Sequence, residues 1–202
     1  PSAGASPLDA IPPAEFDLTL LFCDIRGFTH LLESSQPGAA FQFIERFLHV
    51  LTSAVVENSG TVNNHTGDGF LAQFGIGDLL AGNHARQAVN SAIAIRERVA
   101  RFNQERHERG EPTISVGLGL HTGRAAGGTV RVGGLQSFLL IGDTVNAAAR
   151  IESLTKEFAV DILVSESTRQ ALPATYPLVP MPPRKIRGRA SEIGLHWLPP
   201  HA

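Results

Sequence analysis

The sequence predicts an α+β fold, in which a mostly antiparallel sheet is covered by helices on one face. Short apolar runs of strand length alternate with longer amphipathic segments in the order β-α-β-β-α-β, with additions. This is the order of a ferredoxin-like split βαβ sandwich. The chain has 202 residues, of which 43% are hydrophobic, so it can bury the core of one large domain. No internal repeat is apparent. We therefore expect a single domain preceded by a short arm.

The N-terminal segment, residues 1–14, is rich in Pro, Ala, Gly and Ser and offers little to bury. Such a composition is typical of a linker or an arm, which leaves residues 15–202 for the folded domain. The first residue is proline rather than methionine, which indicates a piece of a longer protein. Leu18–Cys23 is an apolar run that predicts the first strand, and Asp24 ends it.

A helix and a hairpin are expected after this strand. Apolar residues recur at helical spacing between Pro37 and Gly60, which favour the start and the end of a helix. Thr61–His65 and Phe70–Phe74 then flank a Thr-Gly-Asp-Gly turn. This pattern predicts a hairpin with Asp68 at its tip.

The second half of the chain alternates in the same way. Taken alone, a glycine-heavy stretch over residues 122–136 indicates a flexible hairpin loop. The other elements are expected, in order, as a helix over residues 85–102, strands over 113–121 and 137–141, a helix over 142–156, a strand over 162–164, a short helix over 166–172 and a strand pair over 184–198 broken at Gly188.

Charge and cysteine content exclude several classes of function. The formal net charge is −2 and no long run of like charge occurs, so nothing favours a nucleic-acid surface. The one cysteine, Cys23, cannot form an internal disulfide, which indicates a reducing compartment, the cytoplasm. No apolar stretch reaches the ~18 residues needed to span a bilayer, and no signal peptide opens the chain. Membrane contact is expected only through parts outside this sequence.

Two acidic residues predict a metal site. Asp24 at a strand end and Asp68 at a hairpin tip can both point outward at one edge of a sheet. Mg²⁺ prefers hard oxygen ligands and is often held by one or two carboxylates together with substrate phosphates. The alternative is that Asp24 caps the following helix and Asp68 is only a turn residue.

A second pair of polar residues lies in the segment LLIGDTVNAAARIESL. Asn146 and Arg150 are four residues apart and share one face of a helix. An amide and a guanidinium presented together can position a ribose and neutralise a phosphate. The alternative is a helix N-terminus capped by Asp143 or Thr144, with Arg150 paired to a nearby acid.

Taken together, the motifs CDIRGFT, TGDGFLAQF and IGDTVNAAAR resemble those of a class III nucleotidyl cyclase catalytic domain, in the same order and spacing. The resemblance covers roughly Phe16 to Leu198. It implies that Asp24, Asp68 and the backbone carbonyl of Ile25 hold two divalent cations, Mg²⁺ or Mn²⁺. These cations would activate the ribose 3′-hydroxyl and hold the α-phosphate while diphosphate leaves.

The resemblance also implies roles for the residues around the phosphates. Arg150 would stabilise charge on the α-phosphate, and Asn146 would orient the ribose. Arg187, in the run PRKIRGRA, stands where the family has a phosphate-binding lysine; the alternative is a solvated basic edge. The β- and γ-phosphates would meet the backbone amides of three consecutive residues, Arg26, Gly27 and Phe28.

The two residues that read the base depart from the family pattern. Asn64 stands where adenylyl cyclases have lysine and guanylyl cyclases have glutamate, and Leu139 stands where a polar residue is common. Asparagine can pair with either purine, whereas leucine offers no hydrogen bond. We expect ATP to be favoured over GTP as the substrate, because Asn64 lacks the preference of glutamate for guanine. Loss of a polar contact relaxes discrimination, so a guanylyl or relaxed-specificity cyclase is the alternative.

In the family, the metal aspartates and the Asn/Arg pair of one site come from different subunits. This chain carries both, so the resemblance implies a two-fold homodimer that makes cyclic AMP from ATP. The glycine-rich segment Gly123–Gln136 matches the dimerisation arm of the family. A non-catalytic nucleotide-sensing domain is a further alternative, although Asp24 and Asp68 are both present. The GG[DE]EF signature of diguanylate synthases is absent from the chain.

Overall fold

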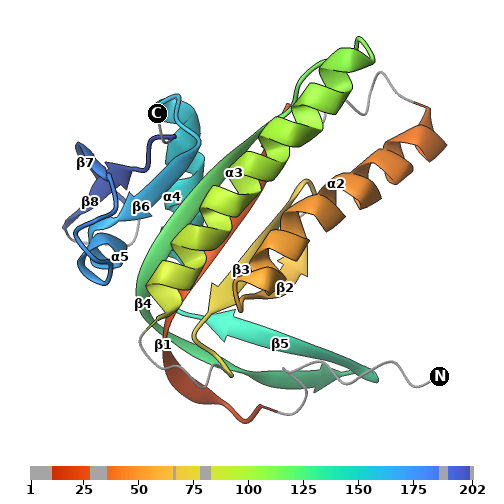
Figure 1. Cartoon of the computed structure of the whole chain (residues 1–202). Helices are drawn as coiled ribbons and strands as arrows, with labels where there is room; N and C mark the ends of the chain where they lie inside the picture. Colours follow the sequence, from red (N-terminus) through yellow and green to blue (C-terminus); the bar gives the residue numbers. More distant parts are fainter. Residues whose placement is uncertain (1–10, 28–35, 66, 78–82, 187–190, 201–202) are drawn as a thin grey trace.

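The computed structural model describes residues 11–27, 36–65, 67–77, 83–186 and 191–200. These residues form one eight-stranded mixed sheet with helices packed on it (Figure 1). The predicted α+β fold is therefore confirmed. The predicted boundary between an arm and a domain near residue 14 stays a prediction, since residues 1–10 are outside the described part of the chain.

The sheet has the order β2-β3-β1-β4-β6-β8-β7, and β5 pairs with β4 at the far end of that strand. Only the β4–β6 pair is parallel among the described pairings. The strands are β1 (Ala14–Arg26), β2 (Thr61–His65), β3 (Gly69–Phe74), β4 (Ser115–Val132), β5 (Leu135–Ile141), β6 (Ile162–Ser165), β7 (Val179–Lys185) and β8 (Glu192–Trp197). The helices are α2 (Pro37–Glu57), α3 (His84–Glu108), α4 (Asp143–Glu157) and α5 (Glu166–Gln170).

Helices cover both faces of the sheet, so the expectation of one covered face is wrong. Leu21 and Cys23 of β1 belong to the apolar core beneath α2 and α3. Leu18 and Leu20 pack on the opposite side with Ala148 of α4. A strand buried on both faces is apolar without alternation, and residues 18–21 are all fully buried.

Strand β4 is shaped to receive α4. Leu118 and Leu120 face the α2–α3 core, whereas the glycines between them face α4. A Cβ atom at Gly119 would lie 2.1 Å from the backbone nitrogen of Glu152. A side chain at Gly119 would therefore push α4 away from the sheet.

Two strands differ from the predicted ranges. β1 continues past Asp24 to Arg26, because β4 continues to pair with it as far as Ser115. β7 begins at Val179 rather than at Arg184. It contains three prolines, which are tolerated because β7 is an edge strand of the sheet.

The glycine-rich stretch forms a regular hairpin, so the interpretation as a flexible loop is wrong. β4 runs to Val132, turns at Gly133 and Gly134, and pairs back along β5. Both turn glycines have positive φ, as a tight hairpin turn requires. Ile11 lies beside this hairpin, where its amide donates to Thr129 Oγ1 at 3.1 Å.

Helix α2 corrects the expectation that no segment is long and apolar enough to span a membrane. The segment Gly38–Glu57 meets that test by length and composition, with a mean hydropathy of 1.2. In the fold, Phe47, Leu51 and Val55 of this helix are fully buried in the core beneath it. Phe41 and Val56, by contrast, are exposed.

Candidate active site

Asp24 and Asp68 converge, as the sequence predicts. The register of β1 and β3 places Asp24 opposite Gly69, so the hairpin tip lies beside the end of β1. The Ile25 amide donates to the Asp68 carbonyl oxygen at 3.2 Å. The pKa of Asp24 is raised, first by burial, and then by the charge of Asp68 and a hydrogen bond between the two carboxyl groups. We call Asp24, Ile25 and Asp68 the metal edge.

The two glycines that flank Asp68 explain why the hairpin comes so close to β1. Gly67 has φ +68°, a left-handed conformation that favours glycine. A Cβ atom at Gly69 would lie 2.1 Å from the carbonyl oxygen of Cys23. Gly67 is therefore needed for the turn, and Gly69 for the close approach of the hairpin to β1.

The backbone of Ile25 also faces the hairpin. The N–H and C=O of one strand residue point to the same side of the strand in an antiparallel pair. Because the Ile25 amide reaches Asp68, its carbonyl oxygen is directed to the side on which Asp68 lies. This orientation suits the role of metal ligand that the family resemblance implies for this carbonyl oxygen.

The residues of the metal edge fit a divalent cation. Two carboxylates in hydrogen-bond contact repel each other when both are ionised, and an adjacent cation removes that cost. The pKa of Asp24 is raised first by burial and then by this repulsion. Among the described residues no cluster of three or more His, Cys, Asp or Glu side chains could hold a metal, so further oxygen ligands would come from backbone, water or substrate.

The helix-cap alternative for Asp24 is wrong, because Asp24 lies inside β1. The cap alternative for α4 is also wrong. The N-cap residue of α4 is Gly142, so neither Asp143 nor Thr144 occupies the cap position. Thr144 instead donates its hydroxyl to the carbonyl oxygen of Arg124 on β4 at 2.5 Å.

Two charged residues beside the metal edge, Glu152 and Lys156, were not predicted from the sequence, and Arg26 was predicted there only for its backbone amide. The pKa of Glu152 is raised to about 7, first by burial and then by the charge of Asp24. Lys156 and Arg26 oppose both shifts. The Arg26 guanidinium also donates to the carbonyl oxygen of Val160, so this side chain joins β1 to the segment after α4.

Asn146 and Arg150 lie together but away from the metal edge. With Ala149 and Ser153 they line an open depression of about 430 Å³ on the outer side of α4, which we call the α4 depression. Both side chains are exposed, whereas Ala147 on the opposite side of α4 is buried. No ion pair of Arg150 occurs among the described residues. One chain therefore does not bring the Asn/Arg pair to the two aspartates.

The base-reading candidates also lie apart in the sheet. Asn64 is exposed on β2, in the hairpin that carries Asp68, next to an irregularity in the β2–β3 register. Leu139 lies on β5 and is 41% exposed. Arg26 is inside β1, and Gly27 follows it with φ +70°. Two predicted phosphate-binding residues, Phe28 and Arg187, lie outside the described residues.

Residues 13–199 match the family model of the adenylate and guanylate cyclase catalytic domain. The chain belongs to this family. The cyclase domain is 34% identical over 186 residues to an adenylate cyclase of Anabaena cylindrica, a match that covers 89% of this chain and 36% of that protein. It is also 34% identical over 164 residues to guanylate cyclase D of Mus musculus, which covers 80% of this chain and 14% of the relative.

The solved structures show the same fold. The adenylyl cyclase CyaB from P. aeruginosa matches the cyclase domain with a TM-score of 0.86 at 23% identity, covering 95% of this chain and 98% of that one. The guanylyl cyclase Cya2 matches with a TM-score of 0.83 at 21% identity, covering 93% and 94%. The chain thus spans a whole structural domain but about a third or less of these curated relatives.

Proposed function

We propose that this chain converts ATP to 3′,5′-cyclic AMP and diphosphate at the interface of a homodimer. The convergence of Asp24 and Asp68 is the observation that carries the proposal. It supports catalysis over a non-catalytic nucleotide-sensing domain, because two carboxylates held in contact without a cation cost stability. We place the reaction in the cytoplasm, in agreement with the buried free thiol of Cys23.

Asp24, Asp68 and the Ile25 carbonyl would hold the Mg²⁺ or Mn²⁺ ions, two per site. When bound, these ions lower the pKa of the ribose 3′-hydroxyl and neutralise phosphate charge. In the reaction, the 3′-oxygen forms a bond to the α-phosphorus, the bond to the β-phosphate oxygen breaks, and the hydroxyl proton leaves to solvent. The aspartates thus set where the α-phosphate lies.

Asn146 and Arg150 would act on the other side of the substrate. The Asn146 amide can hold the ribose ring so that its 3′-oxygen faces the α-phosphorus. The Arg150 guanidinium can stabilise the charge that develops as diphosphate leaves, a role worth roughly 10³–10⁵ in rate in related phosphoryl transfers. Arg26, Gly27, Phe28 and Arg187 keep their proposed roles at the phosphate tail.

A two-fold dimer would bring the Asn146/Arg150 pair of one chain close to Asp24 and Asp68 of the other. The α4 depression opens outward, so Asn146 and Arg150 can serve the metal edge of a second copy. The β4–β5 hairpin offers an apolar surface for the contact, since Leu139 is 41% exposed and Ile141 is 66% exposed. An isologous interface would then contain two equivalent sites.

We favour ATP over GTP because Asn64 carries no negative charge to pair with the N1–H and N2–H donors of guanine. The alternative, a guanylyl or relaxed-specificity cyclase, is favoured by Leu139, which can donate no hydrogen bond to adenine. Relatives named as adenylate and as guanylate cyclases both reach 34% identity.

The test is to incubate the purified chain with each of the four ribonucleoside triphosphates and either Mg²⁺ or Mn²⁺, and to identify the product by mass. Cyclic AMP as the main product is the expected result. A dominant cyclic GMP product would overturn only the choice of base. Release of diphosphate without a cyclic product would overturn the proposed reaction.

A further inference from the structure

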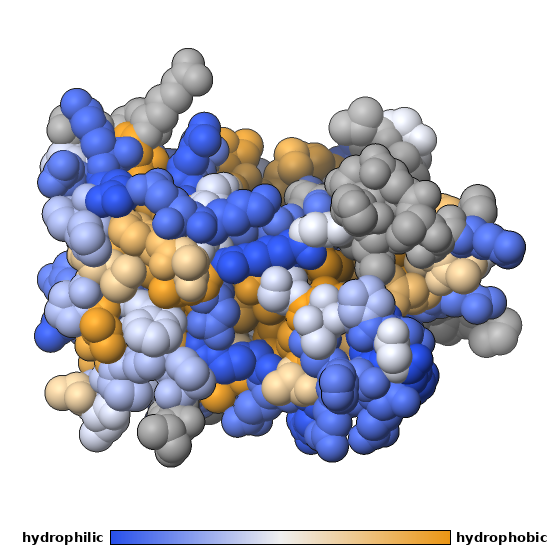
Figure 2. Space-filling view, turned by 90° about the horizontal axis from the view of Figure 1, so that it is seen from above, coloured by the Kyte–Doolittle hydropathy of each residue, from blue (hydrophilic) through white to orange (hydrophobic). Residues whose placement is uncertain are grey.

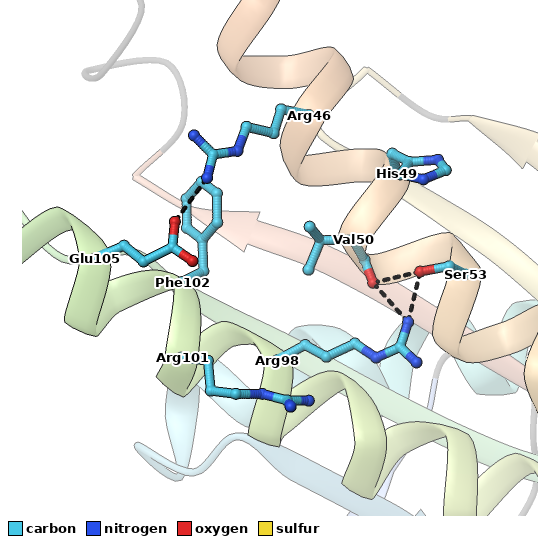
Figure 3. Close-up of a pocket in the computed structure, with 8 residues that line it drawn as sticks. All are labelled: Arg46, His49, Val50, Ser53, Arg98, Arg101, Phe102 and Glu105. Carbon is cyan, nitrogen blue, oxygen red and sulfur yellow. Dashed lines mark hydrogen bonds and ion pairs between the residues drawn. The ribbon is translucent and has the colours of Figure 1, made fainter.

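A groove between α2 and α3 carries an excess of positive charge that the proposed reaction does not use. It measures about 340 Å³ and is lined by residues of these two helices alone. Figure 3 shows the side chains that point into it. Three of the lining residues are arginines, and Glu105 is the one acidic residue among them. A volume of this size is within the range of small-molecule sites.

Two of the arginines are held in place. The Arg98 guanidinium donates to Ser53 Oγ at 2.5 Å and to the Val50 carbonyl oxygen at 3.3 Å, and it also pairs with Glu57. Arg46 pairs with Glu105 at 2.6 Å, and its guanidinium carbon lies 5.3 Å from the centre of the Phe102 ring. These contacts fix the positions of two N–H donor groups at the groove before any ligand arrives.

Arg101 has a different environment. It makes no ion pair or hydrogen bond with another described residue, and in Figure 3 no interaction reaches it or His49. Glu57 and Glu105 each already pair with another arginine. Among the lining residues and the carboxylates that pair with them, three arginines therefore stand against two glutamates, Glu57 and Glu105.

We propose that this groove binds the phosphate group of a small molecule. Guanidinium groups bind phosphate through parallel N–H bonds, and three of them around one groove suit an anion with more than one charge. Val50 and Phe102 supply an apolar floor for the rest of the ligand. His49 at the rim would add a further donor. The bound ligand would join α2 to α3, on the face of the sheet opposite α4.

The site is tested by titration calorimetry with inorganic diphosphate in the presence of EDTA, at fixed ionic strength. EDTA removes cations that would recruit the probe to the metal edge. The Arg101→Gln variant should bind at least about tenfold more weakly, because it loses a charge-assisted contact. Arg101 has no hydrogen-bond or ion-pair partner within the described part of the chain, so the thermal unfolding of this variant should match the parent.

Two matched variants keep the test specific. Arg86→Gln removes an exposed arginine of α3 outside the groove, and Arg150→Gln removes the arginine of the α4 depression. Arg86→Gln should bind diphosphate as the parent does, and Arg150→Gln should keep the part of the binding that Arg101→Gln loses. Equal losses in Arg86→Gln and Arg101→Gln would show only general charge attraction and would overturn the proposal. Loss in Arg150→Gln alone would overturn it as well, by assigning the binding to the α4 depression.

Parallel titrations with ADP distinguish a nucleotide from a free phosphate compound. Tighter binding of ADP than of diphosphate, lost in Arg101→Gln, supports a nucleoside diphosphate ligand. Equal binding of both supports a site for the phosphate group alone. No measurable binding of either probe overturns the proposal and leaves the groove to an acidic macromolecule. None of these readouts needs cyclase activity, so they stand apart from the proposed function.

Discussion

The metal edge and the α4 depression are built in opposite ways. At the metal edge a backbone hydrogen bond, a hydrogen bond between carboxyl groups and two glycines bring Asp68 against β1. In the α4 depression Asn146 and Arg150 stand exposed on a helix, and no described residue pairs with Arg150. Viewed from above, the molecule shows hydrophilic residues around hydrophobic patches (Figure 2).

The contrast between the metal edge and the α4 depression indicates which part of the candidate site one chain can form alone. The metal edge is already assembled in one copy, because its residues are neighbours in a hairpin and a strand. The α4 depression presents functional groups without a target on the same chain. A second subunit is the simplest source of that target, and the following predictions test this division.

The largest effect is expected from mixing two inactive variants. Asp24→Ala and Asn146→Ala should each lower the cyclase rate by about 10³-fold or more, because each removes one part of both sites. An equal mixture should recover about a quarter of the parent rate, since half of the dimers are mixed and each holds one intact site. Product formation per mole of protein is the measurement.

Thermal unfolding of both variants controls for misfolding in this experiment. Native mass spectrometry must show that mixed dimers form. Mixed dimers without any recovery would mean that each chain builds its whole site alone.

Gly69→Ala should disrupt the metal edge through packing. The new Cβ would meet the Cys23 carbonyl oxygen, so the hairpin must move away from β1. We expect a loss of about 3 kcal/mol in the free energy of unfolding, measured by urea denaturation. Gly38→Ala is the matched control, because nothing lies within 4 Å of the added atom on α2. The control should stabilise the protein slightly, by about 0.5 kcal/mol. Similar behaviour of both variants would contradict the packing argument.

Cation binding should depend on the metal edge alone. Mn²⁺ at about 100 times its dissociation constant should stabilise the parent by about 2.7 kcal/mol. Asp68→Asn should abolish this gain, whereas Asn146→Ala should keep it. Thermal unfolding with and without EDTA gives the comparison. Loss of the Mn²⁺ effect in Asn146→Ala would show that the α4 depression contributes to the cation site.

The smallest effect concerns Glu152. Its pKa is about 7 in the folded state against an ordinary value of 4.5, so in this window the folded state holds a proton that the unfolded state has released. In EDTA, stability should therefore fall as pH rises from about 4.5 to 7. We expect a loss of roughly 1–2 kcal/mol, less than the full shift because the carboxyl group is partly hydrated.

Glu152→Gln should remove the Glu152 contribution to this pH dependence. Glu97→Gln, which changes an exposed acid on α3, should retain it. The measurement is the free energy of unfolding of the parent and of both variants at several pH values. Identical pH profiles for the parent and Glu152→Gln would contradict the raised pKa.

Sequence patterns predicted the parts of the site that depend on local chemistry. The hairpin tip at Asp68 follows from a Thr-Gly-Asp-Gly turn between two strand-length runs, and the shared face of Asn146 and Arg150 follows from helical spacing. Both are confirmed in position. Their catalytic roles, together with those of Phe28 and Arg187, remain predictions.

The remaining features arise from contacts between distant segments. Glu152 looks like an ordinary helix acid in the sequence, and only its packing over Gly117 and Gly119 reveals it as part of the site. The helix on the second face of the sheet was missed because the apolar run Leu18–Leu21 does not by itself say whether one face of the strand is covered or both. The first part of β7, residues 179–183, was missed because its prolines argue against a strand unless its edge position is known.

Strand β4 joins two regions of the molecule, the packing site of α4 and the hairpin with β5. Its 18 residues correspond to a contour length of roughly 60 Å. One end lies under α4 at Gly117 and Gly119, and the other carries the hairpin with β5. In the proposed dimer, a displacement of the hairpin by the second subunit would reach the helix that bears Arg150 through this one strand, so the angle between the subunits would affect where Arg150 lies.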